Sequence, residues 1–154
     1  MTLLYIIQTQ KIFPCPQSMV VYFRDMKKFS EWSELKESLN DKSHKAPFVS
    51  EGDIWWASIG ENVGSEIGGK SKQFSRPVII FKKLAHGFYF VIPTTTKSKD
   101  GSWYVAFTHS GVSTSACLQQ ARAIDYRRLS SKLGTLDQTD MHVVKEGFKN
   151  LYLK

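Results

Sequence analysis

The feature that most constrains the fold is a series of short β-branched and aromatic segments in the middle of the chain, separated by glycine, proline and Asp-Gly. Such segments predict strands, and the residues between them predict tight connections. Strands are expected over 53–59, 76–83, 88–92, 102–107 and 113–118. Five or so short strands with tight turns indicate a small antiparallel barrel or sheet.

The connections between these segments also carry signals. Residues 60–75 hold four glycines and predict a long loop. Pro77 belongs at the start of its strand, where a missing N–H costs least. His86-Gly87 predicts a turn, and Asp100-Gly101 predicts a hairpin leading into the strand at 102–107.

Amphipathic helices are predicted on both sides of the strands, because apolar residues recur there at spacings of three and four. The first helix is expected within 26–41 and the second over 137–151, and residues 42–50 are polar and predict a linker. The recurring apolar residues are Phe29, Trp32, Leu35 and Leu39 in the first helix and Met141, Val144, Phe148 and Leu151 in the second.

The N-terminal residues 1–25 differ from the rest, since they lack periodicity and contain Pro14-Cys15-Pro16. We expect a poorly ordered extension or an over-long start, followed by the helix and linker at 26–50 and one barrel domain at 51–154. The apolar run at 3–7 is too short for a membrane span, which needs ~20 residues, or for a signal peptide. No transmembrane helix, export signal or membrane partner is therefore expected.

Cysteine usage points to a reducing compartment. The 154 residues contain only Cys15 and Cys117, which excludes a disulfide framework and a Cys-rich zinc module. Two free thiols in the cytoplasm are expected, and a single disulfide stays open as the alternative.

The charge is concentrated in one stretch. The chain has 21 Lys and Arg against 14 Asp and Glu, a net charge of +7, and residues 67–99 contain no acid. Because this stretch holds seven cations, the remaining 14 (21 − 7) balance the 14 acids. Folded as a hairpin, residues 70–76 and 94–99 are expected to converge into a basic surface that binds phosphates. Nearby aromatic residues are candidates for base stacking, with one tryptophan of the adjacent pair expected in the core instead. They are Trp55, Trp56, Phe74, Trp103 and Tyr104.

Six segments in series, covering about residues 51–151, resemble the PemK/MazF toxins. They are Glu51-Gly-Asp-Ile-Trp-Trp, Val63-Gly-Ser-Glu-Ile-Gly-Gly, Ser75-Arg-Pro-Val-Ile-Ile, Val91-Ile-Pro-Thr-Thr-Thr-Lys-Ser, Ser115-Ala-Cys-Leu-Gln-Gln-Ala-Arg-Ala-Ile-Asp-Tyr-Arg-Arg-Leu and Lys132-Leu-Gly-Thr-Leu. The resemblance implies a mainly β fold with α (α+β), a small SH3-like antiparallel barrel of the PemK/MazF/CcdB kind. The helix near the N-terminus is extra to that pattern, and a helix closes the chain.

The resemblance also implies a function. Family members are toxin endoribonucleases that cut single-stranded mRNA without a metal or other cofactor, usually as homodimers, and a cognate antitoxin protein neutralises them. DNA binding is also associated with the family. The fold is shared with gyrase-poisoning toxins, so fold alone does not decide the chemistry. The alternatives are a non-catalytic binding module on the same barrel, directed at RNA or at a protein, and a decayed toxin kept as a scaffold.

By position, Arg76 matches the family's catalytic arginine and Thr95 its catalytic threonine, with Thr94 as the fallback in the run of three. Metal-free cleavage uses the RNA 2′-OH as nucleophile, so the enzyme supplies positioning and charge stabilisation. An arginine fork suits the phosphate oxygens. Glu66 could orient Arg76 or accept the 2′-OH proton, or it could simply face solvent.

The remaining expected site residues bind RNA. Lys70 and Lys72 are mobile phosphate contacts, and Gln120 contacts a base or a loop. Gln119 stands where many family members have Asp, and the loop before Arg76 is longer than in compact members. The four histidines are expected at the surface, although the loop of His109 could approach the site, and no metal site is expected. Thr94, Thr96 and Lys97 complete the expected RNA-binding set.

Overall fold

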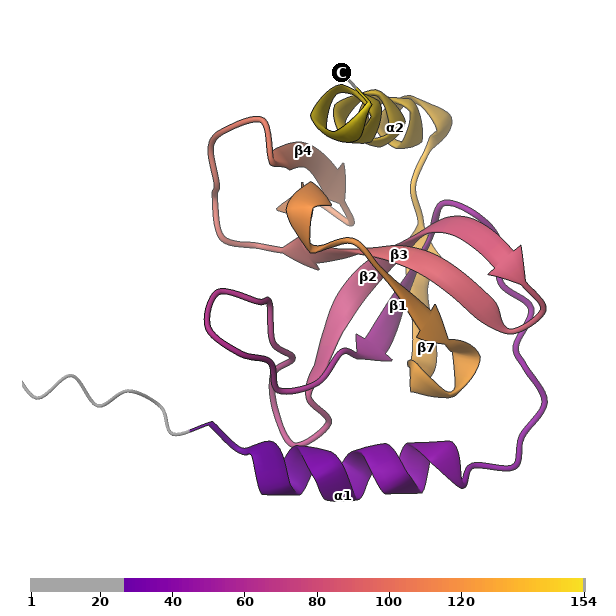
Figure 1. The fold of residues 1–154 in the computed structure, drawn as a ribbon. Coiled ribbons are helices and arrows are strands. Elements are labelled where there is room, and N and C mark those ends of the chain that lie inside the picture. The colour runs from indigo at the N-terminus through magenta and orange to yellow at the C-terminus, as the bar shows by residue number, and fades with distance from the viewer. Residues whose placement is uncertain (1–26, 154) are drawn as a thin grey trace, which may run out of the picture.

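The structure, a computed structural model, describes residues 27–153. The predicted N-terminal extension at 1–25 lies outside the described residues. Residues 27–153 form seven strands, two α-helices and two short 3-10 segments (Figure 1). The strands are β1 (Asp53–Ser58), β2 (Ser75–Ala85), β3 (Phe88–Thr95), β4 (Tyr104–His109), β5 (Val112–Cys117), β6 (Arg122–Asp125) and β7 (Leu129–Thr135); the helices are α1 (Phe29–Asn40) and α2 (Gln138–Tyr152); the 3-10 segments are η1 (Leu118–Gln120) and η2 (Tyr126–Arg128).

The strands form one antiparallel sheet in the order β4-β5-β3-β2-β1-β7, with β6 also paired to β3. Strand β3 has two partners along one edge: its first half pairs with β6 and its last two residues pair with β5. This change of partner bends the sheet and directs the β4–β5 hairpin away from β6. The predicted mainly β fold with α is confirmed, and the barrel stays open between β4 and β7 in the described part of the chain.

The predicted hairpin at Asp100-Gly101 is wrong, because β4 pairs with β5 and not with β3. The hairpin turn is Ser110-Gly111, where both residues have positive φ (50° and 76°) and join the partners His109 and Val112. Two adjacent residues with positive φ define the type I′ turn, whose twist matches that of the flanking strands. Asp100-Gly101 instead lies in the connection that carries the chain from β3 to the far edge of the sheet.

Strands β6 and β7 were not predicted. β7 is largely polar and exposed, and β6 has only four residues. Neither has the apolar alternation from which a strand is predicted. Pairing with β1 and β3 holds them in the sheet, so their conformation is decided by partners distant in sequence.

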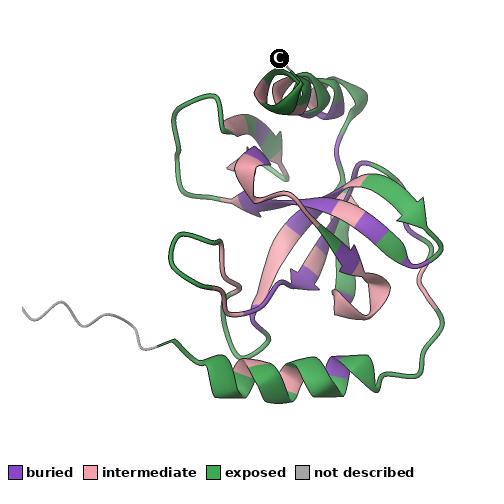
Figure 2. Cartoon of the chain, in the orientation of Figure 1, coloured by how far each residue is buried: buried purple, intermediate pink, exposed green. Residues whose placement is uncertain are grey.

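The core lies on both faces of the central strands β1, β2 and β3, as the buried segments in Figure 2 show. Alternation along β2 sends Val78 and Ile80 to one face and Ile79 to the other. Alternation along β1 buries Trp55 and leaves Trp56 half-buried. The prediction that one tryptophan of this pair enters the core is therefore confirmed.

The two helices have different relations to this core. α2 is capped at its N-terminus by Asp137, whose side chain accepts a hydrogen bond from Asp140 N. It covers one face of the sheet through Val144 and through Phe148, which packs on Phe81 and Phe90. α1 lies across the opposite end of the molecule and is mostly exposed, with Leu39 its one buried side chain among the described residues.

A buried carboxylate ties β1 to β7. Asp53 is 2% exposed; its carboxylate accepts from Ser50 N (3.0 Å) and Thr135 Oγ1 (2.9 Å) and pairs with Lys132 Nζ (2.7 Å). Burial opposes its charge, but these hydrogen bonds outweigh burial, so the pKa of Asp53 lies below its usual value. The ionised side chain therefore stabilises the folded state.

Asp53→Asn is expected to lower the free energy of unfolding by about 2 kcal/mol at pH 7, because the amide offers an N–H to donors. A depressed pKa stabilises the fold above the unfolded-state value of about 4, and this contribution is lost as pH falls through the folded-state pKa. Urea unfolding of the wild type and of Asp53→Asn from pH 7 to pH 3 measures the difference in their free energies of unfolding. A difference that does not shrink in acid would contradict this account.

Candidate active site

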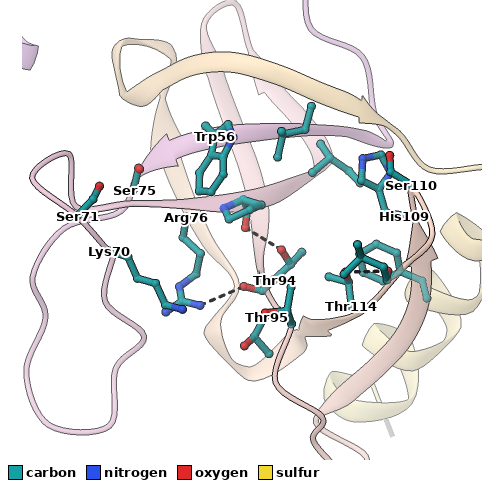
Figure 3. Close-up of a pocket in the computed structure, with 16 residues that line it drawn as sticks. Trp56, Lys70, Ser71, Ser75, Arg76, Thr94, Thr95, His109, Ser110 and Thr114 are labelled. Carbon is teal, nitrogen blue, oxygen red and sulfur yellow. Dashed lines mark hydrogen bonds between the residues drawn. The ribbon is translucent and has the colours of Figure 1, made fainter.

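A cleft of about 630 Å³ opens between the end of the central strands and the β4–β5 hairpin (Figure 3). Lys70 and Arg76 enter it from the β1–β2 loop and from β2, and Thr95 enters from the end of β3. His109 lies on the other side, on β4. Apolar side chains complete the walls: Ile54, Trp56, Phe107, Val112 and Leu133. The cleft therefore has a basic side and an apolar side.

Arg76 is held by two backbone carbonyls. Its Nε donates to Gly68 O (2.9 Å) and its Nη1 donates to Thr94 O (3.3 Å). A guanidinium has five N–H donors, so three remain for a ligand. Burial lowers the pKa of Arg76 from its usual value. The strand and the loop thus aim a desolvated fork into the cleft, and no carboxylate of residues 27–153 pairs with it.

The structure distinguishes the neighbouring threonines. Thr94 is buried, and its hydroxyl donates to Pro77 O (3.1 Å). Thr95 is half-buried, lines the cleft, and accepts at its hydroxyl from Lys97 N (3.2 Å), so its own O–H is free to donate. Thr96 lies at the exposed rim. Of the three hydroxyls, that of Thr95 is best placed to reach a ligand beside Arg76.

A smaller hollow of about 220 Å³, here called the side pocket, adjoins the cleft and shares Lys70, Arg76 and Thr95 with it. No Asp or Glu lines either hollow among the described residues. Burial raises the pKa of the Cys117 thiol to about 11, so this cysteine is not a nucleophile at neutral pH. The other main residues of the side pocket are Lys97, Lys99, Tyr104, Gln119 and Gln120.

The glycine-rich loop at 60–75 is folded back on itself. Gly69 N donates to Gly60 O (2.8 Å), and Lys70 and Ser75 exchange two backbone hydrogen bonds (2.8 and 3.0 Å). A Cβ on Gly69 would lie 1.7 Å from Phe74 O, so only glycine fits there. This compact turn sets both the position of Lys70 and that of the Gly68 carbonyl that binds Arg76.

For Gln120 and Glu66 the structure shows one of the alternatives that the sequence left open. Gln120 accepts from Ile67 N (3.0 Å) and donates to Ser65 O (3.3 Å), so it binds the loop, one of the two predicted alternatives. The exposed Glu66 accepts from Val63 N (3.1 Å), and no contact joins it to Arg76 in the described part of the chain. Backbone carbonyls orient Arg76 in its place.

The fold brings some cations of the basic stretch at 67–99 to the two hollows and places the others elsewhere on the surface. Lys70, Arg76, Lys97 and Lys99 converge on the two hollows, as the hairpin reasoning predicted. Lys72 is exposed near the tip of the loop and lines neither hollow. Lys82 and Lys83 lie further along β2, where Lys82 pairs with Glu51 (3.0 Å).

Of the aromatic residues considered for base stacking, some line the hollows and others are buried or lie elsewhere. Trp56 lines the cleft and Tyr104 lines the side pocket, whereas Trp55 and Phe74 are buried. Trp103 is exposed outside both hollows. Phe74 and Trp55 are therefore core residues, as expected for one tryptophan of the pair, and neither ring is placed to stack on a base.

The four histidines were expected at the surface, with the alternative that the loop of His109 approaches the site, and His109 does line the cleft. It is half-buried, lines the cleft, and lies so close to Gly134 on β7 that a Cβ there would be 2.4 Å from its ring. His44, His86 and His142 are exposed. The position of His109 depends on its contact with β7, a strand that was not predicted from the sequence.

The fold and the cleft define a small β-sheet protein with a basic cleft that no Asp or Glu of the described residues lines. Residues 50–152 match the family described as PemK-like, MazF-like toxin of type II toxin–antitoxin system. The match covers more than half of the chain, and the chain belongs to this family. α1 lies outside the matched residues.

Solved structures share the fold. MazF from Deinococcus radiodurans is 22% identical, with a TM-score of 0.59 over 70% of this chain and 100% of that chain. An endoribonuclease in complex with its cognate antitoxin from a Mycobacterial species is 13% identical, with a TM-score of 0.53 over 67% and 93%. A MazE–MazF structure from D. radiodurans is 19% identical, with a TM-score of 0.52 over 68% and 96%. Comparison with curated protein sequences gives no match.

Among residues 27–153, neither helix has the length and apolar character needed to cross a membrane.

Proposed function

We propose that the protein is a toxin endoribonuclease that cleaves single-stranded mRNA in the cytoplasm without a metal ion. The observation that carries the proposal is Arg76, which is held by two carbonyls and lies beside the Thr95 hydroxyl, with three N–H groups that no residue of 27–153 uses. Because backbone carbonyls carry no net charge, these two hydrogen bonds do not neutralise Arg76, and a bound phosphate would supply the missing anion. Family membership supports the same reading.

The proposed reaction is an internal transesterification. The ribose 2′-oxygen attacks phosphorus, the bond from phosphorus to the 5′-oxygen breaks, and a 2′,3′-cyclic phosphate and a 5′-OH form. Arg76 and Thr95 donate hydrogen bonds to the non-bridging oxygens, whose charge grows in the transition state. The 2′-OH proton leaves to solvent or to Glu66, which is exposed on the loop beside the side pocket. The leaving 5′-oxygen takes a proton from solvent.

Substrate binding is proposed to follow the cations. Lys70 and Lys97, with Thr96 at the rim, contact phosphates flanking the scissile one, and Lys72 at the loop tip contacts a more distant phosphate. Trp56 and Tyr104 offer faces on which unpaired bases stack, and this favours a single strand over a duplex. Gln120 is proposed to act through the loop that it holds.

The apolar side of the cleft supports a protein partner. Val112 and Leu133 are 50% and 41% exposed although they line the cleft. We propose that a cognate antitoxin covers this side and blocks RNA entry, and that the toxin itself is a homodimer, as family membership suggests. Light scattering of the purified protein, alone and with its antitoxin, measures both assemblies.

The direct test is cleavage of a long single-stranded RNA by purified, antitoxin-free protein in EDTA, with the matching duplex as the comparison. Discrete fragments ending in a 2′,3′-cyclic phosphate, formed from the single strand only, are expected. Absence of cleavage by the folded protein would contradict the proposal and favour the alternative, a non-catalytic binding module. Fluorescence anisotropy with labelled RNA would then separate RNA binding from protein-directed binding.

The two threonines are expected to give opposite results. Thr95→Val should slow RNA cleavage by about 100-fold with little change in stability, because it removes a donor to the phosphate. Thr94→Val should instead lower the free energy of unfolding by about 1 kcal/mol, because Pro77 O loses its partner. Single-turnover cleavage and urea unfolding of both variants measure this. Equal effects on cleavage would show that the hydroxyls are not distinguished as described.

A further inference from the structure

The helix α1 contacts the glycine-rich loop at 60–75, which helps to position Arg76 in the candidate active site. It lies outside the residues matched to the toxin family, and most of its surface is exposed. Figure 1 shows it lying along the end of the molecule toward which the β1–β2 loop extends. We propose that Trp32 of α1 is a positioning residue that holds the glycine-rich loop and, through it, Arg76. The catalytic consequence of this inference rests on the proposed function.

Trp32 packs directly on both ends of the loop. At the first end, Gly60 faces the indole so closely that a Cβ there would lie 2.6 Å from the ring. At the second end, the ring of Phe74 lies 5.7 Å from that of Trp32. The guanidinium of Arg128 lies 5.3 Å from the Trp32 ring centroid. Arg128 also donates to Ser58 O (3.2 Å), just before the loop.

These contacts are joined to Arg76 by short backbone steps. Phe74 O accepts from Ile59 N (3.0 Å) and Gly60 N (3.2 Å), which closes the base of the loop under the indole. Gly60 O in turn accepts from Gly69 N (2.8 Å). The adjacent residue Gly68 supplies the carbonyl that binds Arg76 Nε. Loss of the indole would therefore loosen the segment that orients the guanidinium.

A second tie joins the beginning of α1 to the same loop. Lys27 Nζ pairs with Glu61 Oε1 (3.0 Å), and Lys28 N donates to Glu61 Oε2 (3.4 Å). These contacts are exposed and contribute little energy by themselves. They lie beside the contact of Trp32 with Gly60, because Glu61 is the next residue along the loop. The loop is thus held from outside by α1 and from inside by Gln120.

The test compares Trp32→Ala with Trp32→Phe and with Phe29→Ala, a matched control on the same helix whose ring is 47% exposed. Peptide-resolved hydrogen exchange measures the loop at 60–75 directly and needs no RNA. Single-turnover cleavage at saturating RNA measures the consequence for catalysis. In Trp32→Ala, exchange in the loop should rise at least tenfold while that of β2 and β3 is unchanged, and cleavage should slow by about 10- to 100-fold.

Trp32→Phe should stay close to the wild type in both loop exchange and cleavage rate, since a ring remains over Gly60. Phe29→Ala should match the wild type in both measurements. Unchanged exchange in the loop of Trp32→Ala would overturn the inference, whether or not the protein cleaves RNA. Faster exchange throughout the sheet would also overturn it, because Trp32 would then act on stability alone. Faster loop exchange with unchanged cleavage would refute the catalytic part. A wild-type protein that cleaves no RNA would contradict the proposed function but leave the exchange result decisive for the loop.

Discussion

Arg76→Ala is expected to slow RNA cleavage by about 1,000-fold or more while the protein stays folded. In the proposed mechanism, Arg76 supplies the main positive charge at the scissile phosphate, and loss of such a group costs about this much. The stability cost should be about 1 kcal/mol, because the variant loses the hydrogen bonds from Arg76 to Gly68 O and Thr94 O. Single-turnover cleavage and thermal unfolding measure the two quantities separately.

Arg76→Lys should recover little of this activity. A lysine carries the charge, but it cannot bind two carbonyls and a phosphate as a planar fork does. Lys82→Ala is the matched control, since Lys82 lies on the same strand and pairs with Glu51 away from the cleft. It should cleave RNA like the wild type. Cleavage by Arg76→Ala at the wild-type rate would remove Arg76 from the mechanism.

Gly69→Ala is expected to have the largest effect on stability. A Cβ on Gly69 would lie 1.7 Å from Phe74 O and 1.9 Å from Phe74 C, so the hairpin between Lys70 and Ser75 must open to accept it. We expect a loss of about 3 kcal/mol of unfolding free energy. Cleavage by the fraction that stays folded should also fall sharply, because the Gly68 carbonyl moves with the loop.

Gly64→Ala provides the comparison within the same loop. Apart from its two neighbours in the chain, no described residue comes within 4 Å of the Cβ position of Gly64, and its positive φ of 58° is what opposes a side chain. A cost of about 1 kcal/mol is expected. Urea unfolding of both variants measures the difference. Equal destabilisation would show that close packing at Gly69 is not what holds the loop.

Several features could be predicted from the sequence because each depends on local chemistry. The apolar runs that became β1, β2 and β3 carry their own strand signal, and the helical spacing of Met141, Val144 and Phe148 placed α2. The family resemblance pointed to Arg76 and Thr95, and the structure brings both to the same cleft. The register of the threonines stayed open, since three identical residues carry no local difference.

Other features depend on partners distant in the chain. β7 is a strand because β1 pairs with it, and its position in turn brings Gly134 against His109. The hairpin formed at Ser110-Gly111 and not at Asp100-Gly101, because β5 pairs with both β4 and β3. Gln120 binds the loop at Ser65 and Ile67, more than fifty residues earlier in the chain.

The amino-acid sequence by itself determined the strand-rich class of fold, the two helices and the cluster of cations, because hydrophobic periodicity and charge are read directly from neighbouring residues. Tertiary structure alone decided which cations share a cleft, which threonine hydroxyl is free, and that Arg76 is oriented by carbonyls and not by Glu66. It also decided that Trp32 lies on Gly60. The physical reason is that contacts between distant segments depend on register and close packing, which local sequence does not specify.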